Sequence, residues 1–289
     1  MPGHFSHYRW RNAARRRILA VAVLAVLVLG IATHAAAEPL EYPLGIAVAE
    51  DGTLYVADRE LHGVWKIVDG QAEPLYRGEK RYRTPLYAAF SAALDNDGKL
   101  LIGDSGTREV YRFGEDGKPQ PLTDGGIGTP LAIAVAKGGE IFVGDLETQR
   151  IWKVPAAGGQ PEEFALVVGV RGLAFDAEGW LWVVSNGGPN QVLKISPDGQ
   201  QTETVVKGRP FRFPHNIVVA DGTAWVTDGY AKAVWKVVPG QPPEKLASGE
   251  PFQNPVGLAR REQTLYVVDS HAKAVFAVSP EGEVSRVTE

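Results

Sequence analysis

The sequence predicts an all-β fold, a ring of six four-stranded antiparallel sheets, from its repeats, its turn residues and its short strands. One segment of about 16 residues recurs six times, with the closing positions Asp58, Asp104, Asp145, Ser185, Asp228 and Asp269. These positions are 46, 41, 40, 43 and 41 residues apart. The chain contains 33 Gly and 20 Pro, which suit many turns between short strands. A period of about 42 residues with four strands per repeat predicts a six-bladed β-propeller.

Each repeat contains four expected strands. The first two form a pair joined by a turn, as in "PLGIAVAEDGTLYVAD" (43–58) and "PLAIAVAKGGEIFVGD" (130–145). A third strand follows each closing residue by six or seven positions, as in "VWKI" at 64 and "IWKV" at 151. A fourth, less regular stretch completes the repeat, as in "AEPLYRG". One four-stranded sheet cannot bury both of its faces, but six sheets packed radially can.

Two recurring residue types are expected to be structural. The third-strand slot holds a large side chain, most often Trp, at Trp65, Trp152 and Trp235. We expect these rings to pack between blades rather than to form a binding stripe. The five closing aspartates could suggest a metal site, but each ends a strand before a turn. A carboxylate that accepts backbone N–H bonds of its own turn explains them without a ligand.

The phase of the repeats predicts how the ring closes. The first repeat begins with a first strand at Leu44, and the sixth ends with a fourth-strand candidate around Val284–Val287. Every blade is therefore expected to be contiguous in sequence, with the first and sixth blades packed face to face. Residues 38–42 are not expected to complete the last blade.

Residues 1–37 are predicted to be a signal peptide that precedes the propeller of residues 38–289. A basic start is followed by an apolar run from Ile18 to Ile31 and by Ala35, Ala36 and Ala37, the order of a secretory leader. We expect cleavage after Ala37 and a periplasmic or secreted protein. An uncleaved anchor is the alternative, although the run is shorter than the ~20 residues that span a bilayer. Arg15-Arg16 leaves the general and twin-arginine export routes open.

Composition excludes several function classes. The absence of cysteine excludes disulfides, thiol chemistry and lipid attachment through cysteine. From Glu38 onward the chain has 25 basic and 34 acidic residues, a net charge of −9. This charge disfavours nucleic acid and anionic lipid as partners. We expect no stable membrane span once the leader is removed.

The repeat pattern carries a family resemblance. "PxGIAV…DGxLYVAD…xVWKI" resembles the NHL-repeat propellers, within the senescence marker protein/gluconolactonase-like superfamily, over nearly all of residues 38–289. The resemblance implies a six-bladed ring whose ligands sit where the first strands begin and where the second strands end. It implies no single activity, because this fold carries many functions.

The beginnings of the six first strands are the best place to search for a functional site. The residues at this position are Leu44, Phe90, Leu131, Arg171, His215 and Val256. Arg171 and His215 are polar and lie in neighbouring blades, which makes them candidate catalytic groups or the centre of an anion site. The alternative is that Arg171 pairs with a nearby Asp and His215 with backbone carbonyls. Asn216, Phe90, Tyr87 and Arg212 are the further candidate ligand-binding residues.

Two resembled enzyme classes can be tested residue by residue. Gluconolactonase-like enzymes hold a divalent metal through Glu, Asn and Asp at the first-strand starts, and this set is not matched here. "PHNI" (214–217) resembles a segment of peptide-amidating lyases, which bind zinc through three inner histidines. Residues 38–289 have three histidines, and His62 and His271 fall in peripheral loops. The same count disfavours virginiamycin-type lyases. We therefore predict no cofactor and no metal site, although a divalent metal remains an alternative.

These observations lead to an expected function with two alternatives. The expectation is an exported, non-catalytic module that binds a small anionic ligand or a protein through one face of the ring. The first alternative is a lactonase-like hydrolase or a lyase centred on Arg171 and His215. The second is a structural interaction module of the cell envelope.

Overall fold

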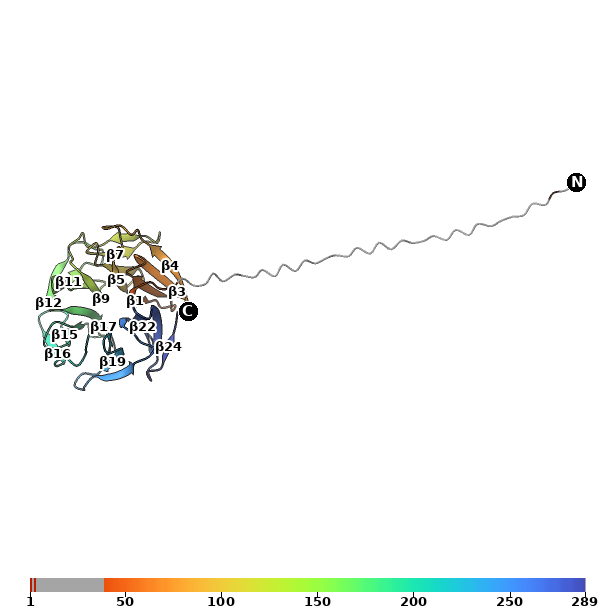
Figure 1. Ribbon diagram of the computed structural model, residues 1–289. Coiled ribbons are helices and arrows are strands. Elements are labelled where there is room, and N and C mark those ends of the chain that lie inside the picture. Colours follow the sequence, from red (N-terminus) through yellow and green to blue (C-terminus); the bar gives the residue numbers. More distant parts are fainter. Residues whose placement is uncertain (2, 4–38, 289) are drawn as a thin grey trace. The chain divides into compact units, whose positions relative to one another are not determined.

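The computed structural model describes Met1, Gly3 and residues 39–288, and its strands form six four-stranded antiparallel sheets arranged in a ring (Figure 1). The fold is the predicted six-bladed β-propeller. The described residues contain no helix, and so none that is long and apolar enough to cross a membrane. The expected signal peptide and its cleavage site lie outside the described residues.

Each blade consists of four consecutive strands, with the first strand innermost. Blades 1 to 3 comprise β1 (Pro43–Val48), β2 (Leu54–Asp58), β3 (Gly63–Val68), β4 (Gln71–Arg77), β5 (Ala89–Leu94), β6 (Leu100–Asp104), β7 (Glu109–Phe113), β8 (Pro119–Pro121), β9 (Pro130–Val135), β10 (Ile141–Asp145), β11 (Arg150–Val154) and β12 (Glu162–Leu166). Blades 4 to 6 comprise β13 (Val170–Phe175), β14 (Leu181–Ser185), β15 (Val192–Ile195), β16 (Thr202–Val206), β17 (Pro214–Ala220), β18 (Thr223–Asp228), β19 (Ala233–Val237), β20 (Glu244–Ser248), β21 (Pro255–Arg261), β22 (Thr264–Asp269), β23 (Ala274–Val278) and β24 (Val284–Arg286).

The ring closes as the repeat phase predicts. Blades 1 and 6 are each contiguous, and β1 lies against β21 and β22. Residues 39–42 form no strand. Leu44 and Trp65 of blade 1 share one hydrophobic cluster with Val256 and Val275 of blade 6. Apolar packing between blade faces therefore joins the two ends of the propeller.

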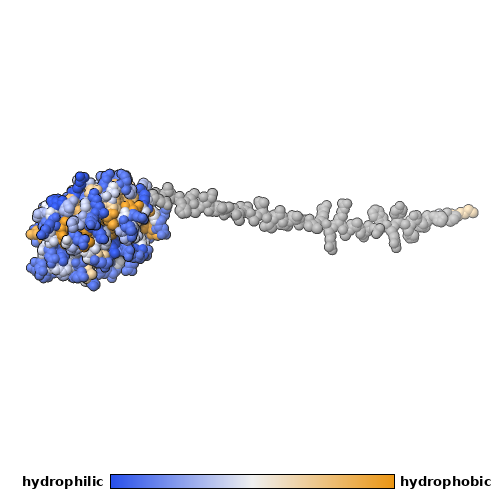
Figure 2. Space-filling model, turned by 90° about the horizontal axis from the view of Figure 1, so that it is seen from below, coloured by the Kyte–Doolittle hydropathy of each residue, from blue (hydrophilic) through white to orange (hydrophobic). Residues whose placement is uncertain are grey.

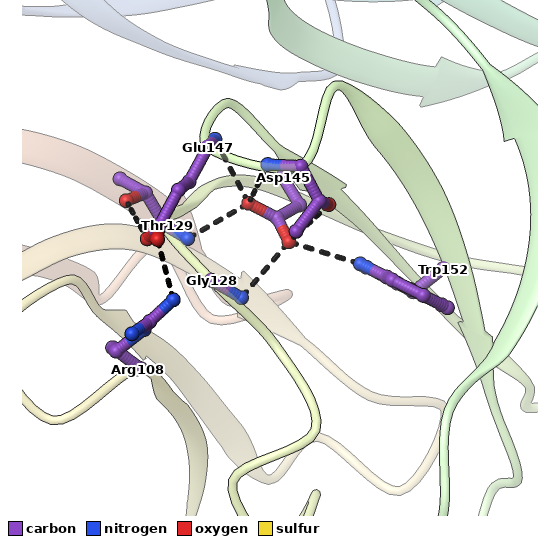
Figure 3. Close-up of polar contacts among 7 residues, drawn as sticks. Arg108, Gly128, Thr129, Asp145, Glu147 and Trp152 are labelled. Carbon is purple, nitrogen blue, oxygen red and sulfur yellow. Dashed lines mark hydrogen bonds and ion pairs between the residues drawn. The ribbon is translucent and has the colours of Figure 1, made fainter.

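The closing aspartates are structural. Asp145 accepts hydrogen bonds from the backbone N–H groups of Gly128 and Thr129, both at 2.8 Å, and of Glu147 at 3.0 Å. The indole of Trp152 donates to the same carboxylate at 3.0 Å (Figure 3). In four other blades, backbone N–H groups of the segment before the first strand likewise donate to Asp58, Asp104, Asp228 and Asp269. Each aspartate ties the turn after its second strand to the segment that enters its first strand.

The large third-strand side chains pack between blades, as predicted. Trp65 is fully buried, and its indole donates a 2.9 Å hydrogen bond to Asp58. Trp152 packs against a cluster shared by blades 2 and 3, and Trp235 against one shared by blades 4 and 5; both are partly buried. These rings belong to the core of the propeller.

Strand pairing defines two faces of the ring. Pro43 at the start of β1 pairs with Asp58 at the end of β2, and the other blades repeat this register. We call this side the top face. It carries the connections from second to third strands and from each blade to the next. The bottom face carries the connections from first to second and from third to fourth strands. Figure 2, turned by 90° from the view of Figure 1, shows hydrophobic residues scattered among hydrophilic ones.

Candidate functional site at the channel mouth

The six inner-strand positions meet around one cavity at the top of the central channel. It is lined by the residues of the predicted ring together with three neighbours: Leu44, Gly45, Phe90, Ser91, Leu131, Arg171, His215, Asn216 and Val256. The cavity measures about 20 Å³, enough for a single water molecule. Only a small chemical group can therefore enter at this level.

The channel widens below this mouth. A cavity of about 460 Å³ is lined by the later residues of all six inner strands, among them Ile46, Ile133, Phe175 and Leu258. Each inner strand pairs on one side only, so its other edge turns unpaired backbone N–H and C=O groups toward the channel. These backbone groups make the lower channel polar despite its apolar side chains.

Arg171 brings an uncompensated positive charge to the mouth. Its side chain extends from β13 and is half-buried. Within residues 39–288 it forms no ion pair and no hydrogen bond, and its Nε is buried without an acceptor. The guanidinium carbon lies 4.9 Å from the ring of Phe213. Burial lowers the pKa of Arg171, because the charged form loses hydration without gaining a counter-ion.

His215 lies in the neighbouring blade, on β17. Its ring meets Phe213 edge to face at 4.9 Å, and neither ring nitrogen forms a hydrogen bond to another described residue. Burial, followed by the positive charge of Arg171, lowers the pKa of His215 to about 3. The imidazole is therefore neutral at neutral pH, with one nitrogen as a donor and the other as an acceptor. Among residues 39–288, the alternative pairing of Arg171 with an Asp and of His215 with backbone carbonyls is not formed.

The blade that carries Arg171 also lacks the closing aspartate. Ser185 occupies that position, and its hydroxyl donates to the carbonyl of Val168 at 2.7 Å. Gly187 and Gly188 in turn donate to the Ser185 hydroxyl. The hydrogen-bonding groups of this turn are therefore satisfied without a carboxylate. The closing position of blade 4 contributes no negative charge near Arg171.

Two side chains near the mouth escaped the sequence-based reasoning. Tyr230 is 66% exposed and stacks on Phe213 with ring centroids 4.7 Å apart. Asn254 and His215 are both next to Gly229. A Cβ at Gly229 would lie 2.2 Å from Asn254 Oδ1 and 3.0 Å from His215 Nε2. Both residues belong to top-face loops, where the strand periodicity does not apply. The sequence indicated them only by the type of side chain, an aromatic ring and an amide in short loops.

The remaining candidate residues lie in different surroundings. Phe90 lines the cavity, and so does Asn216, whose side-chain oxygen accepts from the N–H of Ile217 at 2.8 Å. Tyr87 is not among the cavity residues and instead stacks on His62 at 5.3 Å. Arg212 is exposed on the loop before β17, and its backbone N–H donates to Asp228. The structure thus gathers Arg171, His215, Asn216 and Phe90 and leaves Tyr87 and Arg212 outside.

The mouth offers a single imidazole as a strong metal ligand. His62 and His271 do not line it. Nowhere in the described part of the chain do three or more His, Asp or Glu side chains form a group that could hold a metal ion. Of the ligand types that the two resembled enzyme classes use, the residues lining the mouth include His215 and Asn216.

Sequence comparison identifies the repeat and distant relatives. The NHL repeat model matches residues 40–67. Peptidyl-glycine alpha-amidating monooxygenase A of Xenopus laevis is 25% identical over 228 residues, which cover 68% of this chain and 24% of that protein. The chain thus spans about a quarter of the length of the curated relatives it matches.

Solved structures share the six-bladed ring. A gluconolactonase from Xanthomonas campestris has a TM-score of 0.69 at 18% identity, covering 86% of this chain and 88% of that one. Virginiamycin B lyase from Staphylococcus aureus has a TM-score of 0.65 at 15% identity, covering 86% and 85%. A chain of a nidogen/laminin complex has a TM-score of 0.64 at 18% identity, covering 82% and 89%. Enzymes and binding proteins therefore share this fold.

Proposed function

Starting from a six-bladed propeller that contains an NHL repeat, we propose that the chain is an exported binding module whose channel mouth accepts the carboxylate of a ligand. The observation that carries the proposal is the uncompensated guanidinium of Arg171. A half-buried charge without a counter-ion costs folding free energy, which a bound anion would recover. A carboxylate matches the guanidinium fork with two parallel hydrogen bonds.

The charge and the size of the channel mouth limit the class of ligand that it can bind. His215 is neutral, so Arg171 supplies one positive charge, which suits a carboxylate better than a doubly charged phosphate. Because the cavity holds about one water molecule, only one oxygen of the carboxylate can enter it. The body of the ligand would lie above it, against Phe213 and the exposed ring of Tyr230. His215 would add one hydrogen bond to the anion.

An enzyme is the second candidate. A neutral imidazole beside a guanidinium can take a proton while the cation stabilises the anion that forms. The names of the relatives, an amidating monooxygenase, a lyase and a gluconolactonase, favour this alternative. The nidogen/laminin propeller favours a third candidate, a module that assembles with other proteins of the envelope.

Titration with benzoate, and with benzamide as its neutral counterpart, tests the proposal by NMR. The Arg171 Nε–H signal should shift with benzoate and remain unchanged with benzamide. Arg171→Met should weaken benzoate binding by about 10- to 100-fold. Arg212→Met, which removes an exposed arginine of the same face, is the matched control and should bind as the unmodified protein does. Equal benzoate affinity in the Arg171 variant would refute the proposal.

Metal analysis separates the binding module from a metalloenzyme. The purified protein is expected to contain no stoichiometric divalent ion that EDTA removes. A bound ion at the channel mouth, with binding or activity lost on its removal, would favour the enzyme and overturn the non-catalytic function.

A further inference from the structure

The loops on the two faces of the ring differ in charge. The top-face connections contain ten basic and six acidic residues: Arg59, Lys80, Arg81, Arg83, Arg108, Lys207, Arg209, Arg212, Lys232 and Lys273 against Glu41, Glu60, Glu79, Asp124, Glu147 and Glu250. The bottom-face connections contain three basic and fifteen acidic residues: Lys99, Lys118 and Lys137 against Glu50, Asp51, Asp69, Asp95, Asp97, Glu115, Asp116, Glu140, Asp176, Glu178, Asp198, Asp221, Glu262, Glu281 and Glu283. The basic residues of the loops are thus concentrated on the top face. On the bottom face, the strand residues Arg112, Lys153 and Arg261 pair with Asp95, Glu140 and Glu262.

The closing aspartates are not among the side chains exposed on this face. They are fully buried beneath the top-face loops, and their oxygens already accept hydrogen bonds from those loops. We call the top-face loops around the channel mouth the rim. Several basic residues of the rim are exposed and have no ion pair with another described residue, among them Arg83, Arg212 and Lys232. Their charge is therefore directed to solvent, within the ~8 Å over which physiological salt leaves it effective.

The exposed large hydrophobic residues follow the same division. Within residues 39–288 they are Tyr82 at 66%, Leu166 at 68%, Val168 at 53% and Tyr230 at 66% on the top face, and Val68 at 43% at the bottom end of β3. Arg83 lies over the ring of Tyr82 at 5.5 Å. Aromatic and arginine side chains in one surface are typical of protein-binding hot spots.

We propose that the top face docks an acidic segment of another protein, with one carboxylate in the channel mouth at Arg171 and others on the rim. The central contact rests on the proposed function, whereas the rim contacts stand on the charge asymmetry. A protein segment fits because it carries separate carboxylates together with side chains for Tyr82 and Tyr230. A membrane or a nucleic acid would bring its uniform negative charge against a domain of net charge −9.

Charge reversal on each face tests the docking surface. The top-face variant combines Arg83→Glu, Arg212→Glu and Lys232→Glu, and the matched control combines Lys99→Glu, Lys118→Glu and Lys137→Glu on the bottom face. The two variants have the same net charge and change only exposed loop residues. The probe is a fluorescently labelled peptide of alternating Glu and Tyr, followed by anisotropy, with a Gln–Tyr peptide as the neutral comparison.

The top-face variant should weaken binding of the Glu–Tyr peptide by at least about tenfold, and the bottom-face variant by less than about twofold. Binding to the unmodified protein should weaken as salt is raised, and the Gln–Tyr peptide should not bind. If both variants lost the same affinity for the Glu–Tyr peptide, the effect would depend on net charge alone, and the inference would be overturned. Tighter binding of phosphatidylglycerol vesicles or of a single-stranded oligonucleotide would overturn it in favour of a membrane or a nucleic acid.

Arg171→Met separates the two proposals. If it abolishes benzoate binding while the top-face reversal leaves peptide binding intact, the channel mouth binds carboxylates but the docking surface is refuted. If peptide binding depends on the rim and not on Arg171, the surface stands and the proposed role of the channel mouth fails.

Discussion

Asp145 in blade 3 and Arg171 in blade 4 are charged side chains in neighbouring blades, and the fold treats them in opposite ways. Asp145 is fully buried and accepts six hydrogen bonds, from Gly128, Thr129, Glu147, Thr148 twice and Trp152. Burial alone would raise its pKa, but hydrogen bonds led by the Thr148 hydroxyl outweigh burial and lower the pKa to about 2. Arg171 is half-buried, and no acceptor among the described residues compensates it.

The contrast separates the scaffold from the site. A buried charge whose hydrogen bonds are complete holds two loops together and has nothing left to offer a ligand. A buried charge without a counter-ion is maintained at the expense of stability, and this is common where a protein must bind or react. Mutations at the two residues should therefore have effects of opposite sign on folding.

Asp145→Ala should have the largest effect and destabilise the protein. It leaves the N–H groups of Gly128 and Thr129 and the Trp152 indole without an acceptor, which lowers the free energy of unfolding by about 3 kcal/mol. Chemical denaturation measures the change. Ser185→Ala, at the corresponding position of blade 4, is the control and should cost about 1 kcal/mol. A loss no larger in Asp145→Ala than in the control would remove the distinction between the two blades.

Arg171→Met should have a smaller effect of the opposite sign. It replaces an uncompensated cation by an apolar side chain of similar length, and should raise the free energy of unfolding by about 1 kcal/mol. Arg212→Met on the exposed loop should change it by less than about 0.5 kcal/mol. Denaturation of both variants checks this expectation. A large destabilisation at Arg171 would make it part of the scaffold, as Asp145 is.

The pH dependence of stability should distinguish His215 from Asp145. The pKa of His215 is lowered in the folded state to about 3, so below its unfolded value of about 6.5 the unfolded chain binds more protons. As far as His215 is concerned, the protein therefore keeps its full stability above about pH 6.5, and this residue lowers the free energy of unfolding as the pH falls from there toward 3. Asp145 loses its contribution at lower pH, as the pH falls from about 3.8 through 2.

His215→Asn should flatten the stability profile between about pH 6.5 and 4 and leave the steeper fall at lower pH in place. Arg171→Met should raise the pKa of His215, which a proton NMR titration measures, while burial keeps it below the ordinary value. An unchanged profile in His215→Asn would show that the imidazole is not held neutral by its surroundings.

Periodic features of the sequence predicted most of the fold and the centre of the candidate site. The repeat spacing predicted six contiguous blades, the closure by face packing and the turn role of Asp145, and the structure confirms each of them. The position within the first strand placed Arg171 and His215 among the residues that meet at one cavity. Tyr230 and Asn254 were missed, because loop side chains follow no period and are directed by contacts between blades.

The sequence by itself determined the architecture, because side-chain alternation along a strand and a regular blade length are local properties that repetition makes visible. It also determined that Arg171 and His215 are the two polar residues of the inner ring. Only the tertiary structure decided that Arg171 has no counter-ion among the described residues and that His215 is neutral. Ion pairing and desolvation depend on which side chains from distant repeats share a space, and no local pattern records that.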